Sequence, residues 1–179
     1  MDTPSKLPKG WFSPADIEIY RGMYNRIPDG GLAIEIGVYR GRSLMSVADI
    51  IRERCIGVMA IDSFDPLPEY GDSEANWNAF LEARQEFGVR DWITPFRMKS
   101  CEAAQQLNLQ VDFVFIDGDH GYEAVKQDIE LYEPKVKPGG WIGGHDYQNF
   151  DGVARAVNER FGSRVQVGLE SLIWLVQAT

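Results

Sequence analysis

Residues 32–43 read LAIEIGVYRGRS, an apolar run of strand length followed by a turn that contains two glycines. From Leu44 to Ile51, apolar residues recur at i, i+3, i+4 and i+7, the spacing of one helix face. The stretch therefore predicts a strand, a turn and a helix in succession. The turn lacks the G-x-G-x-x-G pattern, and Glu35 places a carboxylate where a pyrophosphate would need amide protons. A cationic ligand fits this turn better.

The same alternation continues through the rest of the chain. We expect strands at 32–36, 56–61, 92–98, 111–116 and 141–144, the last after a turn at 137–140, and helices at 13–27, 44–51, around 77–88, 101–109, 122–132 and 153–161. A hairpin of 164–169 and 172–177 follows. Five strand–helix alternations predict a three-layer, doubly wound α/β fold that is mostly parallel, with an antiparallel C-terminal hairpin strand.

Length and composition narrow the class of protein. The chain has 179 residues, a net charge of −9, two His and two Cys, which fits one domain: an N-terminal helical extension (1–30) and a core (31–179). No apolar run reaches the roughly 20 residues that span a bilayer, and the acidic balance argues against a nucleic-acid partner. Two distant cysteines and no signal-like N-terminus favour the cytoplasm. We expect a small-molecule partner.

Polar residues follow the strands at the edge where doubly wound sheets bind ligands. Asp62 ends the second strand, where nucleotide-binding folds place an acid that bonds ribose hydroxyls. Ser100 and Cys101 follow the third strand and suit either an adenine pocket or the cap of the next helix. Ser43 is expected to cap the helix after the glycine turn.

Both histidines of the chain fall within four residues of the ends of the fourth and fifth strands. His120 follows Asp117 and Asp119, and His145 precedes Asp146. A lone histidine is usually structural, but two that converge with carboxylates at a ligand-binding edge favour a catalytic site.

These motifs resemble the class I S-adenosylmethionine-dependent methyltransferases. The resemblance rests on Glu35-x-Gly37-x-x-x-Gly41-x-Ser43, Asp62, Ile116–His120 and the Pro-Gly-Gly turn at 138–140. More narrowly, Asp117-Gly-Asp-His-x-Tyr122, Gly144-His-Asp-Tyr147 and Gly152-Val-x-x-Ala-Val157 are similar to a small bacterial group related to catechol-type and macrocin-type O-methyltransferases. The resemblance covers about residues 34–161 and implies a Rossmann-like fold.

The resemblance also implies roles for single residues. The cofactor S-adenosylmethionine would be held by Glu35, Gly37, Tyr39, Gly41, Ser43, Asp62, Ser63, Ser100, Cys101 and Asp117. Within this set, Glu35 and the two glycines would hold the methionine end and Asp62 the ribose. The catalytic residues would be His120, His145 and Asp146, which would act on a hydroxyl of a small-molecule acceptor.

The resemblance leaves open whether the protein binds a divalent metal ion. Asp117, His145 and Asp146 match a metal-binding set in the catechol-type enzymes, for which Mg²⁺ or Mn²⁺ is the candidate ion. His145 in place of a carboxylate disfavours Mg²⁺, which prefers oxygen ligands, and favours Mn²⁺, Fe²⁺ or Zn²⁺. Without a metal, His120 or His145 would remove the proton of the acceptor, with His120 preferred.

Acceptor recognition is expected from residues 1–12, the 63–72 loop with its Phe64, Pro66, Pro68 and Tyr70, the 147–151 loop, or a partner subunit in a homodimer. Trp11, Phe12 and Tyr39 suit either an apolar lid or core packing, and Trp174 is expected in the core. The competing functions are a non-catalytic S-adenosylmethionine-binding domain, a metal-dependent hydroxylase or hydrolase on the same fold, and a nicotinamide-dependent oxidoreductase.

Overall fold

Strands and helices alternate along the described part of the chain. The strands are β1 (Leu32–Ile36), β2 (Gly57–Asp62), β3 (Ile93–Arg97), β4 (Val111–Ile116), β5 (Val136–Gly144), β6 (Gln166–Val167) and β7 (Trp174–Gln177). The helices are α1 (Pro14–Tyr24), α2 (Arg42–Met45), α3 (Ala48–Glu53), α4 (Ser73–Glu86), α5 (Ser100–Gln106), α6 (Tyr122–Tyr132) and α7 (Asp151–Phe161), with short 3₁₀ helices at Glu133–Lys135 and Gly162–Arg164. This structure is a computed structural model that describes residues 6–66 and 71–179.

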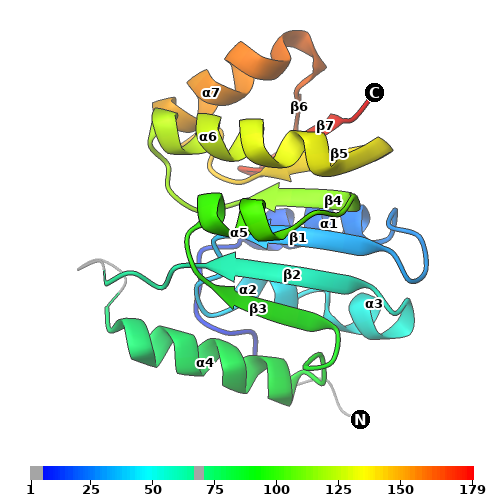
Figure 1. Cartoon of the computed structure of the whole chain (residues 1–179), viewed down its shortest axis with the longest axis vertical. Coiled ribbons are helices and arrows are strands. Elements are labelled where there is room, and N and C mark those ends of the chain that lie inside the picture. Colours follow the sequence, from blue (N-terminus) through cyan, green and yellow to red (C-terminus); the bar gives the residue numbers. More distant parts are fainter. Residues whose placement is uncertain (1–5, 67–70) are drawn as a thin grey trace.

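The strands form a seven-stranded sheet in the order β3-β2-β1-β4-β5-β7-β6 (Figure 1). Strands β1 to β5 pair in parallel, whereas β7 runs antiparallel to β5 and to β6. The chain winds outward from β1 in one direction and from β4 in the other, so the switch point of a doubly wound sheet lies between these two strands. The predicted fold class is confirmed.

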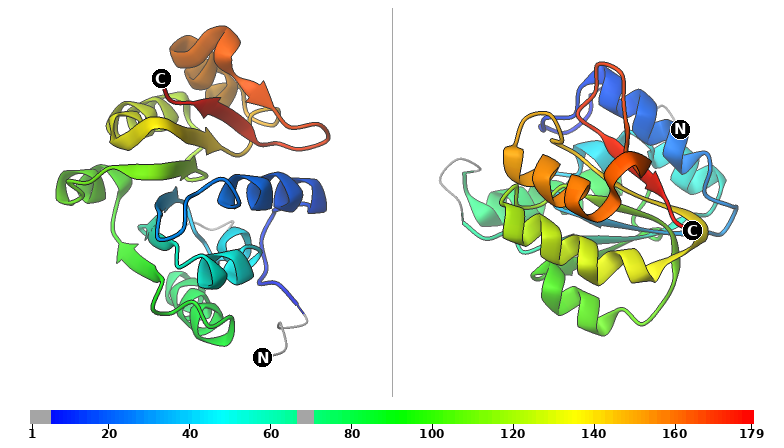
Figure 2. Two further views of the ribbon diagram at one scale, coloured as in Figure 1. Left: turned by 90° about the vertical axis from the view of Figure 1, so that its right-hand side faces the viewer. Right: turned by 90° about the horizontal axis from the view of Figure 1, so that it is seen from above.

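Helices cover both faces of the sheet, as the two views of Figure 2 show. Two hydrophobic clusters lie between the sheet and these helices. Helices α1 to α4 contribute to one cluster, and α5 to α7 contribute to the other. Successive residues of β4 alternate between them, since Phe113 and Phe115 join the first and Val114 and Ile116 the second. Strand β4 is therefore buried on both faces, as predicted, and Trp174 is fully buried in the second cluster.

Three local expectations were wrong. The first helix stops at Tyr24 rather than at Ile27, with Ser13 as its N-cap. The expected helix after the glycine turn is split into α2 and α3 because Val47 leaves helical geometry (φ −116°, ψ 12°). The expected turn at 137–140 lies inside β5, where Gly139 has φ +79° and the C-terminal segment pairs with the strand through Ala178.

None of the helices in residues 6–66 and 71–179 is both long enough and apolar enough to cross a membrane.

Candidate active site

The carboxyl ends of β1, β2, β4 and β5 are joined by backbone hydrogen bonds at one edge of the sheet. Gly37 N–H donates to the carbonyl of Ile61 (2.8 Å), and Asp117 N–H donates to that of Ile36 (2.7 Å). His145 N–H donates to the carbonyl of Ile116 (3.1 Å). The residues after these four strands are therefore fixed next to one another by the main chain.

The turn after β1 lies directly against the end of β4. Gly37 has φ +83°, and a Cβ atom there would lie 1.9 Å from the carbonyl oxygen of Asp117. No residue with a side chain fits at such a distance, so this glycine is required for the close approach of the two segments. Gly41, also at positive φ, is the N-cap of α2, so the predicted cap role of Ser43 was wrong.

Asp62 binds the backbone of this turn. Its Oδ2 accepts from the N–H groups of Val38 (2.9 Å) and Tyr39 (2.8 Å), and its Oδ1 accepts from that of Phe64 (2.7 Å). These bonds hold Tyr39 at φ +49°, a conformation that is uncommon for a residue other than glycine. The carboxylate thus fixes the turn, and its contact with a ribose stays a prediction.

Glu35 lies behind the turn with no exposed surface. Its carboxyl accepts hydrogen bonds from the hydroxyls of Ser43 (2.6 Å) and Tyr20. Burial raises the pKa of Glu35 to about 8, although these two bonds act in the opposite direction. At neutral pH this group is therefore mostly uncharged, so it contributes little to the negative charge of the site. Its contact with a cofactor stays a prediction.

Ser63, Ser100 and Cys101 are half-buried at the ends of β2 and β3. The hydroxyl of Ser100 donates to the buried carboxyl of Asp128 on α6 (2.5 Å), and Lys99 rather than Ser100 is the N-cap of α5. The helix-cap role expected for Ser100 is therefore wrong, and its role in an adenine pocket is not tested by these contacts. That role, like those of Ser63 and Cys101, stays a prediction.

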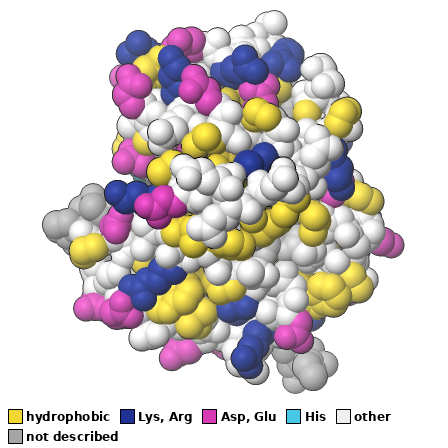
Figure 3. Space-filling model, in the orientation of Figure 1, with side chains coloured by type: hydrophobic (Ala, Val, Ile, Leu, Met, Phe, Trp, Pro, Cys, Tyr) yellow, Lys and Arg dark blue, Asp and Glu magenta, His cyan; other side chains and the backbone are white. Residues whose placement is uncertain are grey.

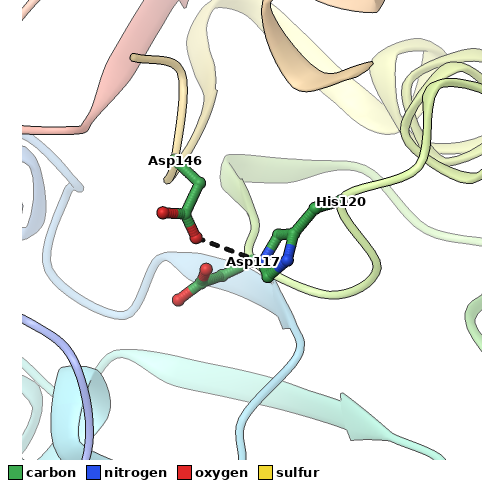
Figure 4. A group of neighbouring side chains, drawn as sticks. All are labelled: Asp117, His120 and Asp146. Carbon is green, nitrogen blue, oxygen red and sulfur yellow. Dashed lines mark ion pairs between the residues drawn. The ribbon is translucent and has the colours of Figure 1, made fainter. Parts of the chain in front are cut away.

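Strands β4 and β5 deliver two carboxylates and two imidazoles to the same place. Asp146 Oδ2 lies 3.1 Å from His120 Nε2 and 3.3 Å from His145 Nδ1, so one carboxylate oxygen bridges both histidines. His145 Nδ1 is also 3.6 Å from Asp117 Oδ1. Figure 4 shows Asp117, His120 and Asp146 facing one another. The predicted convergence of both histidines with these carboxylates is present in the structure.

The two histidines differ in their surroundings. His145 is 3% exposed, and its other ring nitrogen, Nε2, lies 3.2 Å from Asp16 Oδ2 on α1. Burial disfavours its charged form, but the contacts with Asp146 and Asp16 outweigh this and raise the pKa of His145 to about 10. His120 is 25% exposed, and its ring stacks on Phe150 with centroids 4.2 Å apart. Contact with Asp146 raises the pKa of His120 above its ordinary value.

Burial and the neighbouring imidazoles shift the pKa values of the two carboxyl groups. Burial raises the pKa of Asp117 to about 7. Burial also opposes the ionisation of Asp146, but its contacts with His120 and His145 outweigh that effect and keep the pKa of Asp146 well below its usual range. At neutral pH the site therefore contains the charged pair of Asp146 and His145, with His120 beside it.

One group of side chains in the described residues has ligand atoms close enough together for a metal ion. These atoms belong to Asp117, His120 and Asp146 and lie within 4.8 Å of one another. His145 Nδ1 also lies 3.3 Å from Asp146 Oδ2 and 3.6 Å from Asp117 Oδ1. The predicted set of Asp117, His145 and Asp146 therefore stays a prediction, and His120 is a further candidate ligand.

Sequence reasoning missed Asp16 and Phe150 as parts of this site. Asp16 lies in the first expected helix, which was given no part in the site, and Phe150 was included only as a member of the 147–151 loop expected to recognise the acceptor. Nothing in the local pattern points to the site, because α1 reaches it only through the tertiary fold. The Ser13-x-x-Asp16 spacing signals a capping box, which is present, but not a contact with His145.

Trp11, Phe12 and Tyr39, which suit either an apolar lid or core packing, differ in their burial. Phe12 is buried, and its ring packs on that of His145 with centroids 5.0 Å apart, so it belongs to the core. Trp11 is 61% exposed and contacts the ring of Tyr39 at 5.1 Å. In the 63–72 loop, Phe64 is buried, whereas Pro68 and Tyr70 lie outside the described residues.

The fold and site can now be compared with known proteins. A family profile described as "Methyltransferase domain" matches residues 34–147, more than half of the chain. The chain belongs to this family of methyltransferase domains.

The chain is similar to a viral protein over a short stretch and to two solved structures of O-methyltransferases at low sequence identity. A stretch of 40 residues is 48% identical to the "Uncharacterized protein R132" of Acanthamoeba polyphaga mimivirus and spans 22% of this chain and 18% of that protein. The O-methyltransferase NovP has a TM-score of 0.69 at 20% identity, over 96% of this chain and 84% of its own. The O-methyltransferase TomG from Streptomyces achromogenes has a TM-score of 0.70 at 13% identity, over 97% and 84%. These structures share the fold.

Proposed function

We propose that this methyltransferase domain transfers the methyl group of S-adenosylmethionine to a hydroxyl oxygen of a small molecule, with His120 as the general base. The observation that carries the proposal is the 3.1 Å contact between His120 Nε2 and Asp146 Oδ2 at the joined ends of β4 and β5. The described chain places one half-exposed imidazole at this edge, beside the glycine turn. Imidazole is the side chain best suited to proton removal near neutral pH.

The edge of the sheet fits the proposed cofactor. Its carboxylates, Asp62, Asp117 and Asp146, suit a sulfonium cation better than a phosphate group. The glycine turn brings backbone close to the place where the cofactor would lie, and Asp62 is the candidate ligand of its ribose. S-adenosylmethionine supplies an electrophilic methyl group, and the residues of the chain hold it in line with the acceptor. Such positioning contributes roughly 7–11 kcal/mol to the barrier reduction.

His120 and Asp146 form the proposed proton-transfer pair. The ion pair with Asp146 engages Nε2, which leaves Nδ1 as the ring nitrogen that accepts the proton of the acceptor hydroxyl. Asp146 then stabilises the imidazolium that forms, while the charged His145 holds Asp146 from its other side. The stacked ring of Phe150 covers one face of the imidazole.

The same residues allow a metal-assisted variant of this reaction. Two carboxylates and one imidazole, Asp117, His120 and Asp146, form a donor set that suits Mn²⁺, Fe²⁺ or Zn²⁺ better than Mg²⁺. A bound cation would polarise the acceptor hydroxyl as a Lewis acid. In that case His120 would be a ligand and not the base, so the two roles exclude each other.

Methyl transfer can be tested directly. We expect the purified chain, incubated with trideuteromethyl S-adenosylmethionine, to label at least one member of a panel that contains catechol, a simple phenol, a nucleoside-diphosphate sugar and a small-molecule cell extract. The readouts are the mass gain of the acceptor and the formation of S-adenosylhomocysteine. Tight binding of S-adenosylhomocysteine without any labelled acceptor would favour the non-catalytic alternative, and binding of NAD alone would favour an oxidoreductase.

The metal question needs a second arm of the same assay. If His120 is the base, turnover after treatment with EDTA should equal that of untreated protein, and added Mn²⁺ should not raise it. Turnover that is lost with EDTA and restored by Mn²⁺ would assign His120 to the metal instead.

We further propose a small-molecule acceptor, a reducing compartment such as the cytoplasm, and no nucleic-acid partner. On the face shown in Figure 3, basic side chains are interspersed with acidic ones instead of forming one continuous patch. Both cysteines, Cys55 and Cys101, are free thiols. A homodimer remains a proposal, and its test is the molar mass measured by light scattering.

A further inference from the structure

Asp16 is a buried carboxylate at the N-terminus of α1, and its side chain reaches the site from the far end of the sequence. It is 1% exposed and has a polar partner on each side. Oδ1 accepts from the hydroxyl of Ser171 (2.7 Å) and from the N–H of Leu172 (3.0 Å). Oδ2 accepts from the N–H of Ser13 (2.8 Å) and lies 3.2 Å from His145 Nε2. The carboxylate therefore ties α1 to the segment between β6 and β7 and to the end of β5.

A continuous series of contacts leads from Asp16 to the proposed base. Asp16 contacts one ring nitrogen of His145, and the other ring nitrogen contacts Asp146 Oδ2 at 3.3 Å. The same oxygen contacts His120 Nε2 at 3.1 Å. Along the series, carboxylates and imidazoles alternate. Each member is held in place by the next.

The first two members cannot rearrange easily. His145 is almost fully buried and packs on the ring of Phe12, and Asp16 is held by the capping box of α1. Helix α1 is itself anchored, because Arg21 forms a bidentate pair with Asp49 on α3 (2.8 and 2.7 Å). Asp146 has φ +62°, so its side chain leaves the backbone in an uncommon direction that the contacts with both histidines require.

We propose that Asp16 is a positioning residue for methyl transfer, because its carboxylate fixes His145 and thereby fixes Asp146 and the ring of His120. This inference rests on the proposed function, in which His120 is the base. It adds a part of the site that lies outside the residues matched by the family profile, in the N-terminal helix. A helix that looks like an extension of the core is then required for the reaction.

The variant Asp16→Asn tests this role with little change in volume. The amide oxygen can keep the bonds from Ser171 and Leu172, but the amide NH₂ cannot accept from Ser13 or from a protonated His145. Misplacement of a catalytic group by about 1 Å can cost about 10²-fold in rate. We expect kcat to fall about 10- to 100-fold, with the KM of the acceptor and the Kd of S-adenosylhomocysteine within about 2-fold.

The matched control is Ser171→Ala. It removes one hydrogen bond to the same carboxylate and leaves the contact with His145. We expect a lower midpoint of urea unfolding because one hydrogen bond is lost, with kcat within about 3-fold of wild type. Equal losses of kcat in both variants would show that Asp16 acts only by holding the fold together and would overturn the proposal.

A spectroscopic measurement separates this proposal from the proposed function, because it needs no acceptor. The chain has only two histidines, so protein with ¹⁵N-labelled histidine gives two imidazole spin systems. At pH 7, Asp16→Asn should shift the ring nitrogens of His120, which Asp16 does not touch, whereas Ser171→Ala should leave them unchanged. An unchanged His120 in Asp16→Asn would overturn the proposal, even if wild type transfers methyl groups.

If Asp16→Asn does not fold, Asp16→Glu replaces it. The same fall in kcat and the same shift of the His120 ring nitrogens are then expected.

Discussion

The two halves of the active-site edge hold their carboxylates in different ways. On the β1–β2 side, Asp62 accepts from three backbone N–H groups, and Glu35 is buried against two hydroxyls. On the β4–β5 side, the carboxylate of Asp146 contacts two imidazoles instead. The first half is built from main-chain geometry and neutral donors, the second from charged groups. We infer that the first half serves to hold a ligand and the second to move a proton.

This difference has a physical basis. Backbone donors are fixed by the strands and the turn, so they present the same geometry at any pH and suit the binding of a constant ligand. Imidazoles change charge near neutral pH, so they suit a step in which a proton is transferred. Variants in the two halves should therefore separate cofactor binding from turnover.

The largest effect is expected for His120→Asn. Loss of a general base costs typically 10²–10⁴-fold in rate, so kcat should fall by about this factor. Calorimetry should give a Kd for S-adenosylhomocysteine within about 2-fold of wild type, because the cofactor half is untouched.

The control for this variant is Asp119→Asn, in the same turn. Asp119 is exposed and accepts from Gly121 N–H (2.6 Å), which an Asn side chain can also do. Its turnover should match wild type. If His120→Asn weakened cofactor binding as much as turnover, the division between the two halves would not hold.

Asp62→Ala, in contrast, should weaken cofactor binding. Three backbone N–H groups lose their acceptor, and the turn that holds Tyr39 at positive φ relaxes. We expect the Kd of S-adenosylhomocysteine to rise about 10- to 100-fold, which corresponds to about 1.4–2.8 kcal/mol. Asp65→Ala, an exposed neighbour in the same loop, is the control and should bind normally. Unchanged affinity in Asp62→Ala would rule out the ribose role.

The contrast between the halves also explains what could be predicted from the sequence. Strand ends follow from apolar periodicity, so the gathering of Asp62, Asp117, His120 and His145 at one edge could be predicted. Which nitrogen faces which oxygen depends on side-chain packing, so the candidate ligand group of Asp117, His120 and Asp146 could not be predicted.

Contacts with the N-terminal helix were the least predictable part. Asp16 and Tyr20 reach His145 and Glu35 only because α1 packs on the sheet, a placement that no local spacing specifies. The split between α2 and α3 has a similar origin. Their apolar residues keep helical spacing, but the hydroxyl of Ser46 donates to the carbonyl of Ser43 (2.6 Å) where the helix breaks.

Glu35→Gln tests the comparison through the pH dependence of the stability of the fold. Burial raises the pKa of Glu35 from 4.5 to about 8, so between these values the folded state keeps a proton that the unfolded chain releases. The contribution of Glu35 to stability is greatest below pH 4.5 and falls as the pH rises towards 8, by up to about 1.4 kcal/mol per pH unit. Glutamine has no charge to lose, so this contribution to the slope should vanish.

Urea unfolding at pH 5, 6.5 and 8 measures this slope. The control is Glu18→Gln, an exposed position on α1, which should keep the wild-type slope. An identical slope in Glu35→Gln and wild type would show that Glu35 is already ionised in the folded protein. The β1–β2 half would then contain a buried charge, and the contrast with the β4–β5 half would be smaller.

The smallest effect is expected for Phe150, whose ring stacks on His120 at an interplanar angle of 17°. Phe150→Leu keeps an apolar side chain and removes the aromatic face, and a stacked pair contributes about 0.5–1.5 kcal/mol beyond burial. We expect kcat to fall about 2- to 10-fold with unchanged cofactor affinity, because only the orientation of the base is loosened. Leu169→Ala, at an 89% exposed side chain, controls for the loss of surface apolar area. A change in cofactor affinity without a change in kcat would place Phe150 in the ligand-holding half of the site. The orientation of His120 would then depend on Asp146 and His145 alone.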